Sequence, residues 1–166
     1  MESWDKKIQV IKGTYGEELV RGYLESNGWI VYSPATQGAH AFDNLCVKDK
    51  KNIVIAEIKT KARMTYYNAT GFNIASFNEY KYIQDKYKLD VFVFFVDEFL
   101  KKIYGNKLSI LEKSYSAKDG EYPKRMKNII LFSLEIMKDV AIIKESDCEF
   151  LKKASSRNYD YSKEKN

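Results

Sequence analysis

The chain has 166 residues, of which 45% are hydrophobic and 31% charged, a composition typical of a soluble globular protein of about one domain. Its formal net charge of +5 favours a polyanionic partner, because basic groups gain affinity by displacing counterions from phosphates. The longest apolar runs, such as residues 91–96, are too short to span a bilayer, and the first residues lack the apolar core of a signal peptide. We therefore expect a cytoplasmic protein with no membrane partner.

Two cysteines and one histidine limit the metal chemistry open to the chain. Cys46, Cys148 and His40 cannot together supply the four ligands of a zinc site. Apolar neighbours on both sides of Cys46 indicate a reduced core thiol, although a disulfide between the two cysteines stays open. His40 is predicted to lie in an exposed loop, where it could also contact substrate or scaffold.

The first half of the chain predicts a helix followed by three strands. Apolar residues recur at helical spacing over 13–27, and Gly28 offers a left-handed helix end. Strands are predicted at 29–32, 41–47 and 52–59, the last two forming a hairpin across a charged turn.

The second half continues the alternation of helices and strands. In order, we predict a loop at 62–71, a helix at 77–87 capped by Ser76, a strand at 90–96, an edge strand at 102–105, a charged loop at 114–127, a strand at 128–133 and a short helix at 147–153. The whole order predicts an α/β sandwich with a central mixed β-sheet flanked by helices. Residues 1–154 are expected to form one domain, and 155–166 a basic, mobile tail.

Two opposite charges end the apolar strand predicted at 52–59. Alternation along the strand places Glu57 and Lys59 on one face and Ile58 on the other. Burying a carboxylate and an ammonium is costly unless they are paired or bind something, so this pattern indicates a functional site. The alternative is a surface ion pair, which is common and contributes little stability.

Register adds a third charged residue to this face. Asp43 shares the face of Glu57 and Lys59 only if it lies opposite one of them, which requires a hairpin turn with an odd number of residues, or a bulge. On that register four apolar residues join the same face: Leu45, Val47, Ile53 and Ile55. The charges would then lie at the rim of a packed patch.

Three segments resemble the PD-(D/E)XK nuclease superfamily, most nearly its archaeal Holliday-junction resolvase and restriction-endonuclease-like branch. They are, in order, residues 12–20, which place Glu17 in a helix; residues 41–45, around Asp43; and residues 56–59, with Glu57 and Lys59. Phe42 stands before Asp43 where the named motif has proline. The resemblance implies a restriction-endonuclease-like fold with an αβββαβ core, and a DNA endonuclease activity that depends on Mg²⁺, with Mn²⁺ as a substitute.

The resemblance also implies roles for individual residues. Asp43 and Glu57 would supply the carboxylate oxygens that Mg²⁺ prefers, with the backbone carbonyl of Ile58 as a further ligand. Glu17 would bind metal directly or through water. Lys59 would orient or deprotonate the attacking water, for which burial and a bound cation would lower its pKa, or stabilise the charge that develops on the phosphate.

Basic and aromatic residues follow the strand that carries Glu57. Lys61, Arg63, Tyr66 and Tyr67 suit phosphate contact and base stacking, and Lys12, in the first matching segment, joins this predicted DNA-binding set. The same tyrosine-rich segment could instead pack on its own domain.

Three classes of function remain open from sequence. The leading one is a metal-dependent DNA endonuclease, expected to be a homodimer because one site per chain must cleave two strands. The second is a non-catalytic nucleic-acid-binding module of the same fold. The third is a protein-interaction domain that uses some of the 13 tyrosines and 9 phenylalanines.

Overall fold

The computed structural model describes residues 8–34, 40–117 and 125–155. Its elements, in chain order, are α1 (Ile8–Ser26), β1 (Ile30–Tyr32), β2 (Asn44–Lys48), β3 (Asn52–Thr60), β4 (Ala69–Asn73), α2 (Ile74–Tyr87), β5 (Asp90–Asp97), β6 (Lys102–Lys107), α3 (Leu108–Ala117), β7 (Arg125–Met126), β8 (Ile129–Ser133), the 3₁₀ turn η2 (Leu134–Ile136), β9 (Lys138–Ile142) and α4 (Glu145–Lys153). No helix in these ranges is long and apolar enough to cross a membrane.

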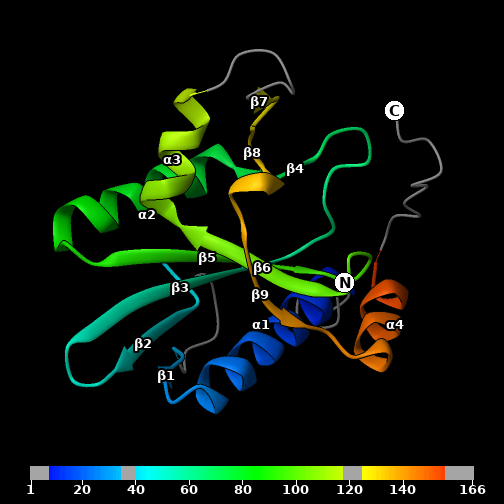
Figure 1. Ribbon diagram of the computed structural model, residues 1–166, viewed down its shortest axis with the longest axis horizontal. Helices are drawn as coiled ribbons and strands as arrows, with labels where there is room; N and C mark the ends of the chain where they lie inside the picture. Colours follow the sequence, from blue (N-terminus) through cyan, green and yellow to red (C-terminus); the bar gives the residue numbers. More distant parts are fainter. Residues whose placement is uncertain (1–7, 35–39, 118–124, 156–166) are drawn as a thin grey trace, which may run out of the picture.

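A six-stranded mixed sheet forms the middle layer. Its strand order is β1-β2-β3-β5-β6-β9, and β3 and β5 are parallel while the other neighbours are antiparallel. Helices α1 and α4 lie against one face, and α2, α3 and the small sheet β4-β8-β7 cover the other (Figure 1). The α/β sandwich predicted from sequence is confirmed.

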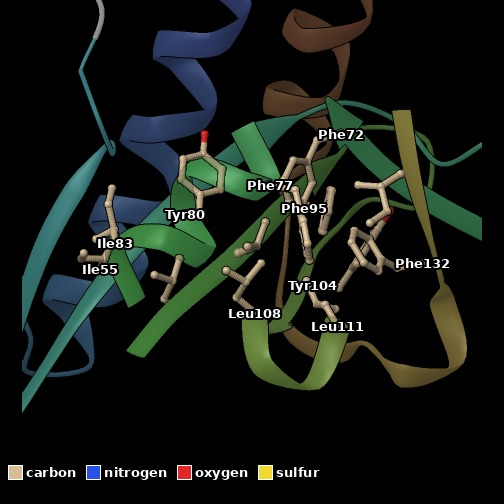
Figure 2. Close-up of a cluster of buried hydrophobic side chains, with 13 residues drawn as sticks. Ile55, Phe72, Phe77, Tyr80, Ile83, Phe95, Tyr104, Leu108, Leu111 and Phe132 are labelled. Carbon is tan, nitrogen blue, oxygen red and sulfur yellow. The ribbon is translucent and has the colours of Figure 1, made fainter. Parts of the chain in front are cut away.

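Each face of the sheet buries its own apolar cluster. On β3, Ile55 belongs to the cluster under α2 and α3, whereas Ala56 and Ile58 belong to the cluster under α1 and α4. The first cluster is rich in aromatic rings, including Phe72, Phe95 and Phe132 (Figure 2). Because helices cover both faces, the middle of β3 is apolar on both sides, which explains its uninterrupted apolar run.

The β2–β3 hairpin has the predicted register. Three residues separate the last pair, Lys48 and Asn52, so the turn has the odd number of residues that was predicted. Strand β2 begins at Asn44, which lies opposite Ala56. Continuing this register places the preceding residue, Asp43, opposite Glu57. The four apolar residues predicted on this face pair across the two strands: Leu45 with Ile55 and Val47 with Ile53.

The region around α2 differs from the sequence prediction. Residues 62–68 have no regular secondary structure, as predicted, but strand β4 takes the last three residues of the predicted loop at 62–71. Pairing with β8 stabilises this short segment, which has no strong strand pattern. Helix α2 then begins at Ile74 instead of following a Ser76 cap. The side chain of Asn73 accepts a 2.8 Å hydrogen bond from the amide of Ala75 and is the true N-cap.

The C-terminal half holds two further differences. Helix α3 includes residues 114–117, which were predicted as the start of a charged loop, and buried Leu108 and Leu111 anchor this helix on the sheet. Strand β6 is not an edge strand, because β9 pairs along its outer side. Residues 118–124 of the predicted loop at 114–127 lie outside the described residues, and residues 125–126 form the short strand β7, which pairs with β8.

The cysteines agree with the sequence interpretation. Cys46 and Cys148 are both buried and free, within the apolar cluster under α1 and α4. Burial raises the pKa of the Cys46 thiol to about 11. His40 is exposed, as predicted. Residues 156–166, which make up nearly all of the predicted tail, are outside the described ranges.

Candidate active site

Glu57 carries a carboxylate into the protein interior. The residue is 2% exposed, on the face of β3 that α2 covers. Its Oε1 atom accepts a 2.5 Å hydrogen bond from the Lys59 ammonium and a second one from the Tyr80 hydroxyl of α2. The Lys59 ammonium also donates to the Tyr80 hydroxyl at 3.0 Å. Three groups from two elements therefore fix one another in position.

Asp43 joins this cluster from the start of β2. Its Oδ2 atom accepts a 2.7 Å hydrogen bond from the backbone amide of Ile58, the residue between Glu57 and Lys59. That bond crosses from one strand to the other, and it holds the Asp43 carboxylate at the end of β3 that bears the charged residues.

Glu17 is brought near by close packing of α1 on β3. The preceding residue, Gly16, is buried, and a Cβ atom there would lie 1.8 Å from Oγ1 of Thr60. Only glycine permits this approach, because even a methyl group would overlap the threonine side chain. The half-buried Glu17 then lies close enough to feel the charge of Glu57.

The three carboxylates raise one another's pKa. Burial raises the pKa of Glu17, of Asp43 and of Glu57, and is the largest cause in each. A neighbouring carboxylate adds to the rise in every case: Glu57 acts on Glu17, Glu17 on Asp43, and Asp43 on Glu57. The cluster thus concentrates more negative charge than Lys59 alone balances, which is an environment that favours a bound cation.

The ammonium of Lys59 is held in its charged form. Burial lowers its pKa, but the Glu57 carboxylate and the Tyr80 hydroxyl outweigh burial, so the pKa is raised overall. Burial thus acts in the expected direction, but sequence analysis did not include the opposing effect of Glu57 and Tyr80. The ammonium also lies 5.3 Å from the ring centre of Tyr80 and 5.8 Å from that of Phe72, contacts that favour a cation. Charge stabilisation therefore suits Lys59 better than proton abstraction.

The donor set suits a hard divalent cation. Within residues 8–34, 40–117 and 125–155, no three His, Cys, Asp or Glu side chains form a ready-made metal cluster. Mg²⁺ needs only one or two carboxylates, because it keeps several waters and takes substrate oxygens. The Oε2 atom of Glu57 is buried, and the described residues donate no hydrogen bond to it, so the site holds an acceptor available to a cation.

Tyr80 is a site residue that sequence analysis did not identify. It is 6% exposed and belongs to the apolar cluster under α2, but its hydroxyl points out of that cluster toward Glu57 (Figure 2). The signal available in the sequence was a tyrosine within an apolar helical stripe, since a buried tyrosine hydroxyl needs a partner.

A second polar network lies beside Asp43 and was also missed. Arg21 donates a 2.7 Å hydrogen bond to the Ser33 hydroxyl, which donates in turn to the buried side-chain oxygen of Asn44. The positive charge of Arg21 partly offsets the rise in the pKa of Glu17. This network ties α1 to β2 next to the carboxylates.

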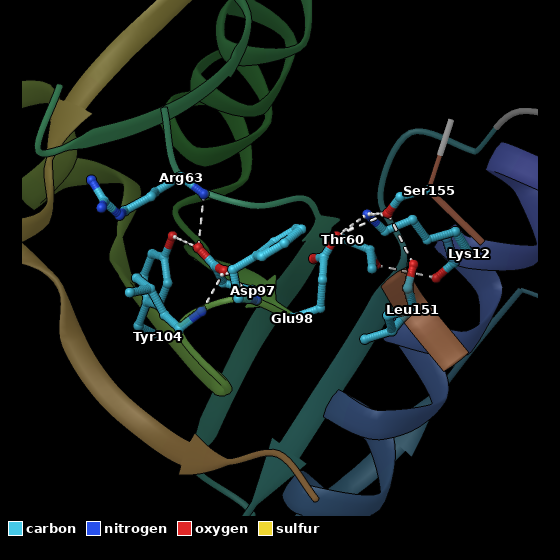
Figure 3. A network of polar contacts seen from close by, with 11 residues as sticks. Lys12, Thr60, Arg63, Asp97, Glu98, Tyr104, Leu151 and Ser155 are labelled. Atoms are coloured by element: carbon cyan, nitrogen blue, oxygen red, sulfur yellow. Dashed lines mark hydrogen bonds and ion pairs between the residues drawn. The ribbon is translucent and has the colours of Figure 1, made fainter. Parts of the chain in front are cut away.

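The predicted DNA-binding residues fall into two places. Arg63, Tyr66 and Tyr67 lie between β3 and β4 and line a pocket of about 500 Å³, and Lys61 directly follows β3. Lys12 instead forms a 2.6 Å ion pair with buried Glu98 (Figure 3). Contact of any of these residues with DNA stays a prediction.

No protein-family model matches the chain, and no curated protein matches it in sequence. Among solved structures, the chain is similar to Archaeoglobus fulgidus Hjc, a Holliday junction resolvase from an archaeal hyperthermophile, with a TM-score of 0.50 and 12% identity. The match covers 75% of this chain and 90% of that one, and at this identity it concerns the fold. The restriction-endonuclease-like fold predicted from sequence is therefore confirmed.

Proposed function

We propose that the protein is a metal-dependent DNA endonuclease that hydrolyses phosphodiester bonds with an activated water. One observation carries the proposal: the carboxylates of Glu17, Asp43 and Glu57 lie close enough to interact at the end of β3, where Lys59 pairs with Glu57 and the Ile58 amide holds Asp43. Structural ion pairs rarely collect excess charge of one sign, because repulsion between like charges destabilises the fold. A cation bound during function would relieve that repulsion.

Each residue of the cluster has a distinct task. Asp43 and Glu57 would hold Mg²⁺ or Mn²⁺, with the carbonyl of Ile58 as a third ligand and Glu17 acting directly or through water. The metal would supply Lewis acidity and lower the pKa of the attacking water. The Lys59 ammonium would stabilise negative charge that develops on the phosphate. Tyr80 would hold the side chains of Lys59 and Glu57 in position through its two hydrogen bonds.

A homodimer is part of the proposal. Ile30 and Tyr32 of the edge strand β1 are 73% and 66% exposed, and Ile53 of β3 is 43% exposed. Register places all three on one face of the sheet, because Ile30 and Tyr32 lie opposite Val47 and Leu45, and Val47 lies opposite Ile53. An exposed apolar face beside an unpaired strand edge suits a second copy of the chain.

Plasmid nicking tests the proposed site. Supercoiled DNA should be nicked by the wild-type protein with Mg²⁺ or Mn²⁺ and not with EDTA. Asp43→Ala and Lys59→Ala should each lower the rate by at least about 100-fold. Glu18→Gln is the matched control for Glu17→Gln, because Glu18 is the exposed neighbour on the same helix. Nicking that survives both alanine substitutions would eliminate this site. Linear, single-stranded and four-way junction DNA, assayed alongside, would identify the substrate.

A second candidate is a non-catalytic nucleic-acid-binding module. The observation in its favour is that Oε1 of Glu57 is already occupied by Lys59 and Tyr80, while no ready-made metal cluster occurs in the described part of the chain. Such a module would bind DNA equally well in Mg²⁺ and in EDTA, and it would show no nicking under either condition.

A further inference from the structure

The connection between β3 and β4 is fixed in place although it has no regular secondary structure. Backbone hydrogen bonds anchor it at both ends, from Lys61 N–H to the Val96 carbonyl at 3.0 Å and from Leu134 N–H to the Asn68 carbonyl at 2.9 Å. In between, the amide of Arg63 donates a 2.7 Å hydrogen bond to the buried carboxylate of Asp97. A connection held in this way can present a pre-formed binding surface.

This connection forms one wall of the pocket of about 500 Å³. The pocket lies beyond the carboxyl ends of the parallel strands β3 and β5, since its lining includes Arg63 after β3 and Leu100 after β5. Ligands of open α/β sheets bind at this edge, and the volume falls within the roughly 300–1,000 Å³ of small-molecule sites.

The lining has the chemistry of a nucleobase site. Tyr66, which is 58% exposed, and half-buried Tyr67 offer aromatic rings at the pocket. Leu100 and Leu134 add apolar surface. Aromatic rings stack on any nucleobase, because every base has a flat π-face.

The charges around the pocket disfavour a phosphate inside it. Arg63 and Lys102 are basic, but Glu135 is acidic and Lys102 forms a 2.7 Å ion pair with Asp139. Positive and negative groups therefore balance. Figure 3 shows the guanidinium group of Arg63 extending away from Asp97, with only the backbone amide directed at that carboxylate. A neutral, flat ring with polar edges fits this lining, and carboxylates and amides can accept from or donate to those edges.

The pocket is close to the proposed site of hydrolysis. Tyr66 follows Lys59 by seven residues, so their Cα atoms are at most about 25 Å apart. Stacked nucleotides rise about 3.4 Å each along a strand, and this distance therefore corresponds to about seven nucleotides or fewer.

We propose that this pocket receives an unpaired base of a DNA strand, within about seven nucleotides of the phosphate held at Asp43 and Glu57. The inference rests on the proposed function for the position of the scissile phosphate, but not for binding itself. It assigns the protein a preference for DNA with single-stranded or unstacked nucleotides over continuous duplex.

Binding of the full chain to a fluorescent oligonucleotide tests the pocket without hydrolysis. The probe is a single strand of about 12 nucleotides containing 2-aminopurine, titrated in EDTA, and the same sequence held in a hairpin duplex is the comparison. Stacking should quench the single-stranded probe. Tyr66→Ala and Tyr67→Ala should each weaken its binding by about 5- to 100-fold, while Tyr66→Phe keeps most of the affinity. Tyr82→Ala is the matched control, because Tyr82 is 59% exposed on α2.

Each outcome supports or overturns the pocket assignment. Equal affinity for duplex and single strand, or equal affinity of the Tyr66→Ala and Tyr82→Ala proteins, would overturn it. Displacement of the probe by free deoxyadenosine monophosphate at similar concentration would also overturn it, because the pocket would then take free nucleotides. If nicking fails but binding keeps its dependence on Tyr66, hydrolysis is refuted and the pocket stands. If nicking requires Asp43 but binding does not depend on Tyr66, the pocket is refuted and the proposed hydrolysis stands.

Discussion

Two buried lysine–glutamate pairs in this protein have nearly the same geometry. Lys59 and Glu57 are 2.5 Å apart, and Lys12 and Glu98 are 2.6 Å apart. Both glutamates are buried, and each leaves its Oε2 atom without a hydrogen-bond partner. Distance and burial therefore do not distinguish the two pairs.

Their surroundings do distinguish them. Glu98 also accepts a 2.9 Å hydrogen bond from the Ser155 hydroxyl, so this pair joins α1, the end of β5 and the segment after α4 (Figure 3). One carboxylate, that of Asp97, interacts unfavourably with Glu98, and three backbone amides donate hydrogen bonds to the Asp97 carboxylate. Glu57 instead lies with two carboxylates, those of Asp43 and Glu17, whose charges interact unfavourably with one another. A buried ion pair alone is thus weak grounds for function, and an excess of one charge around it is stronger grounds.

The largest expected effect is on catalysis. Glu57→Gln and Glu98→Gln make the same isosteric change at the two pairs. We expect Glu57→Gln to slow nicking about 100- to 1,000-fold, because it removes a metal-binding carboxylate. Glu98→Gln should leave the rate per folded molecule unchanged, as measured by plasmid nicking with the folded fraction taken from circular dichroism. Equal losses of activity in both variants would refute a catalytic role that Glu57 has and Glu98 lacks.

Metal binding should also distinguish the two pairs, through a smaller effect measured as a shift in melting temperature. A ligand at 100 times its Kd stabilises a folded protein by about 2.7 kcal/mol, so Mg²⁺ should raise the melting temperature of the wild type. The Glu98→Gln protein should keep this shift and Asp43→Asn should lose it, in a thermal melt with and without Mg²⁺. A full shift in Asp43→Asn would place the cation elsewhere.

For the free energy of unfolding, the order of the two variants should be the reverse of their order for activity. In EDTA, Glu98→Gln should cost about 1.5–3 kcal/mol, because it leaves the Lys12 charge without its counter-ion. Glu57→Gln should cost less, since it also removes repulsion with Asp43 and Glu17. Urea unfolding measures both, with the exposed Glu149→Gln as the surface control. A larger loss at Glu57 than at Glu98 would contradict this assignment.

The sequence predicted the part of the site that is local along the chain. Alternation on one strand placed Glu57 beside Lys59, the hairpin register added Asp43, and the resemblance of residues 12–20 to the superfamily added Glu17. The structure brings these four together, although their roles in catalysis stay a proposal. The fold followed from the same segments, because strong apolar periodicity marks β3 and β5.

Contacts between distant segments could not be predicted from one sequence. Tyr80 bonds a residue 23 positions away, and Lys12 bonds Glu98 across 86 positions. Nothing local marks Lys12 as a structural cation instead of a DNA ligand. Strand β4 and helix α3 were missed for a related reason, because pairing with β8 and burial of leucines stabilise them more than local propensity does.

The smallest expected effect concerns Glu17 and depends on pH. Burial, and then the charge of Glu57, raise the pKa of Glu17, so the folded protein holds its proton more tightly than the unfolded chain does. Ionised Glu17 therefore lowers stability at pH values above the raised pKa, and this cost disappears below the unfolded pKa. Glu17→Gln removes the cost, and it should raise the melting temperature in EDTA at about pH 7 by roughly 1–4 °C.

The size of this gain should fall as the pH is lowered through the window between the raised and the ordinary pKa of Glu17. By about pH 3 the carboxyl is protonated in both states and the two proteins should melt together. Glu18→Gln, one residue along the same helix and exposed, should show no such gain. If both variants gained equally, the effect would come from net charge alone. A gain confined to Glu17 would mean that the negative cluster destabilises the metal-free fold.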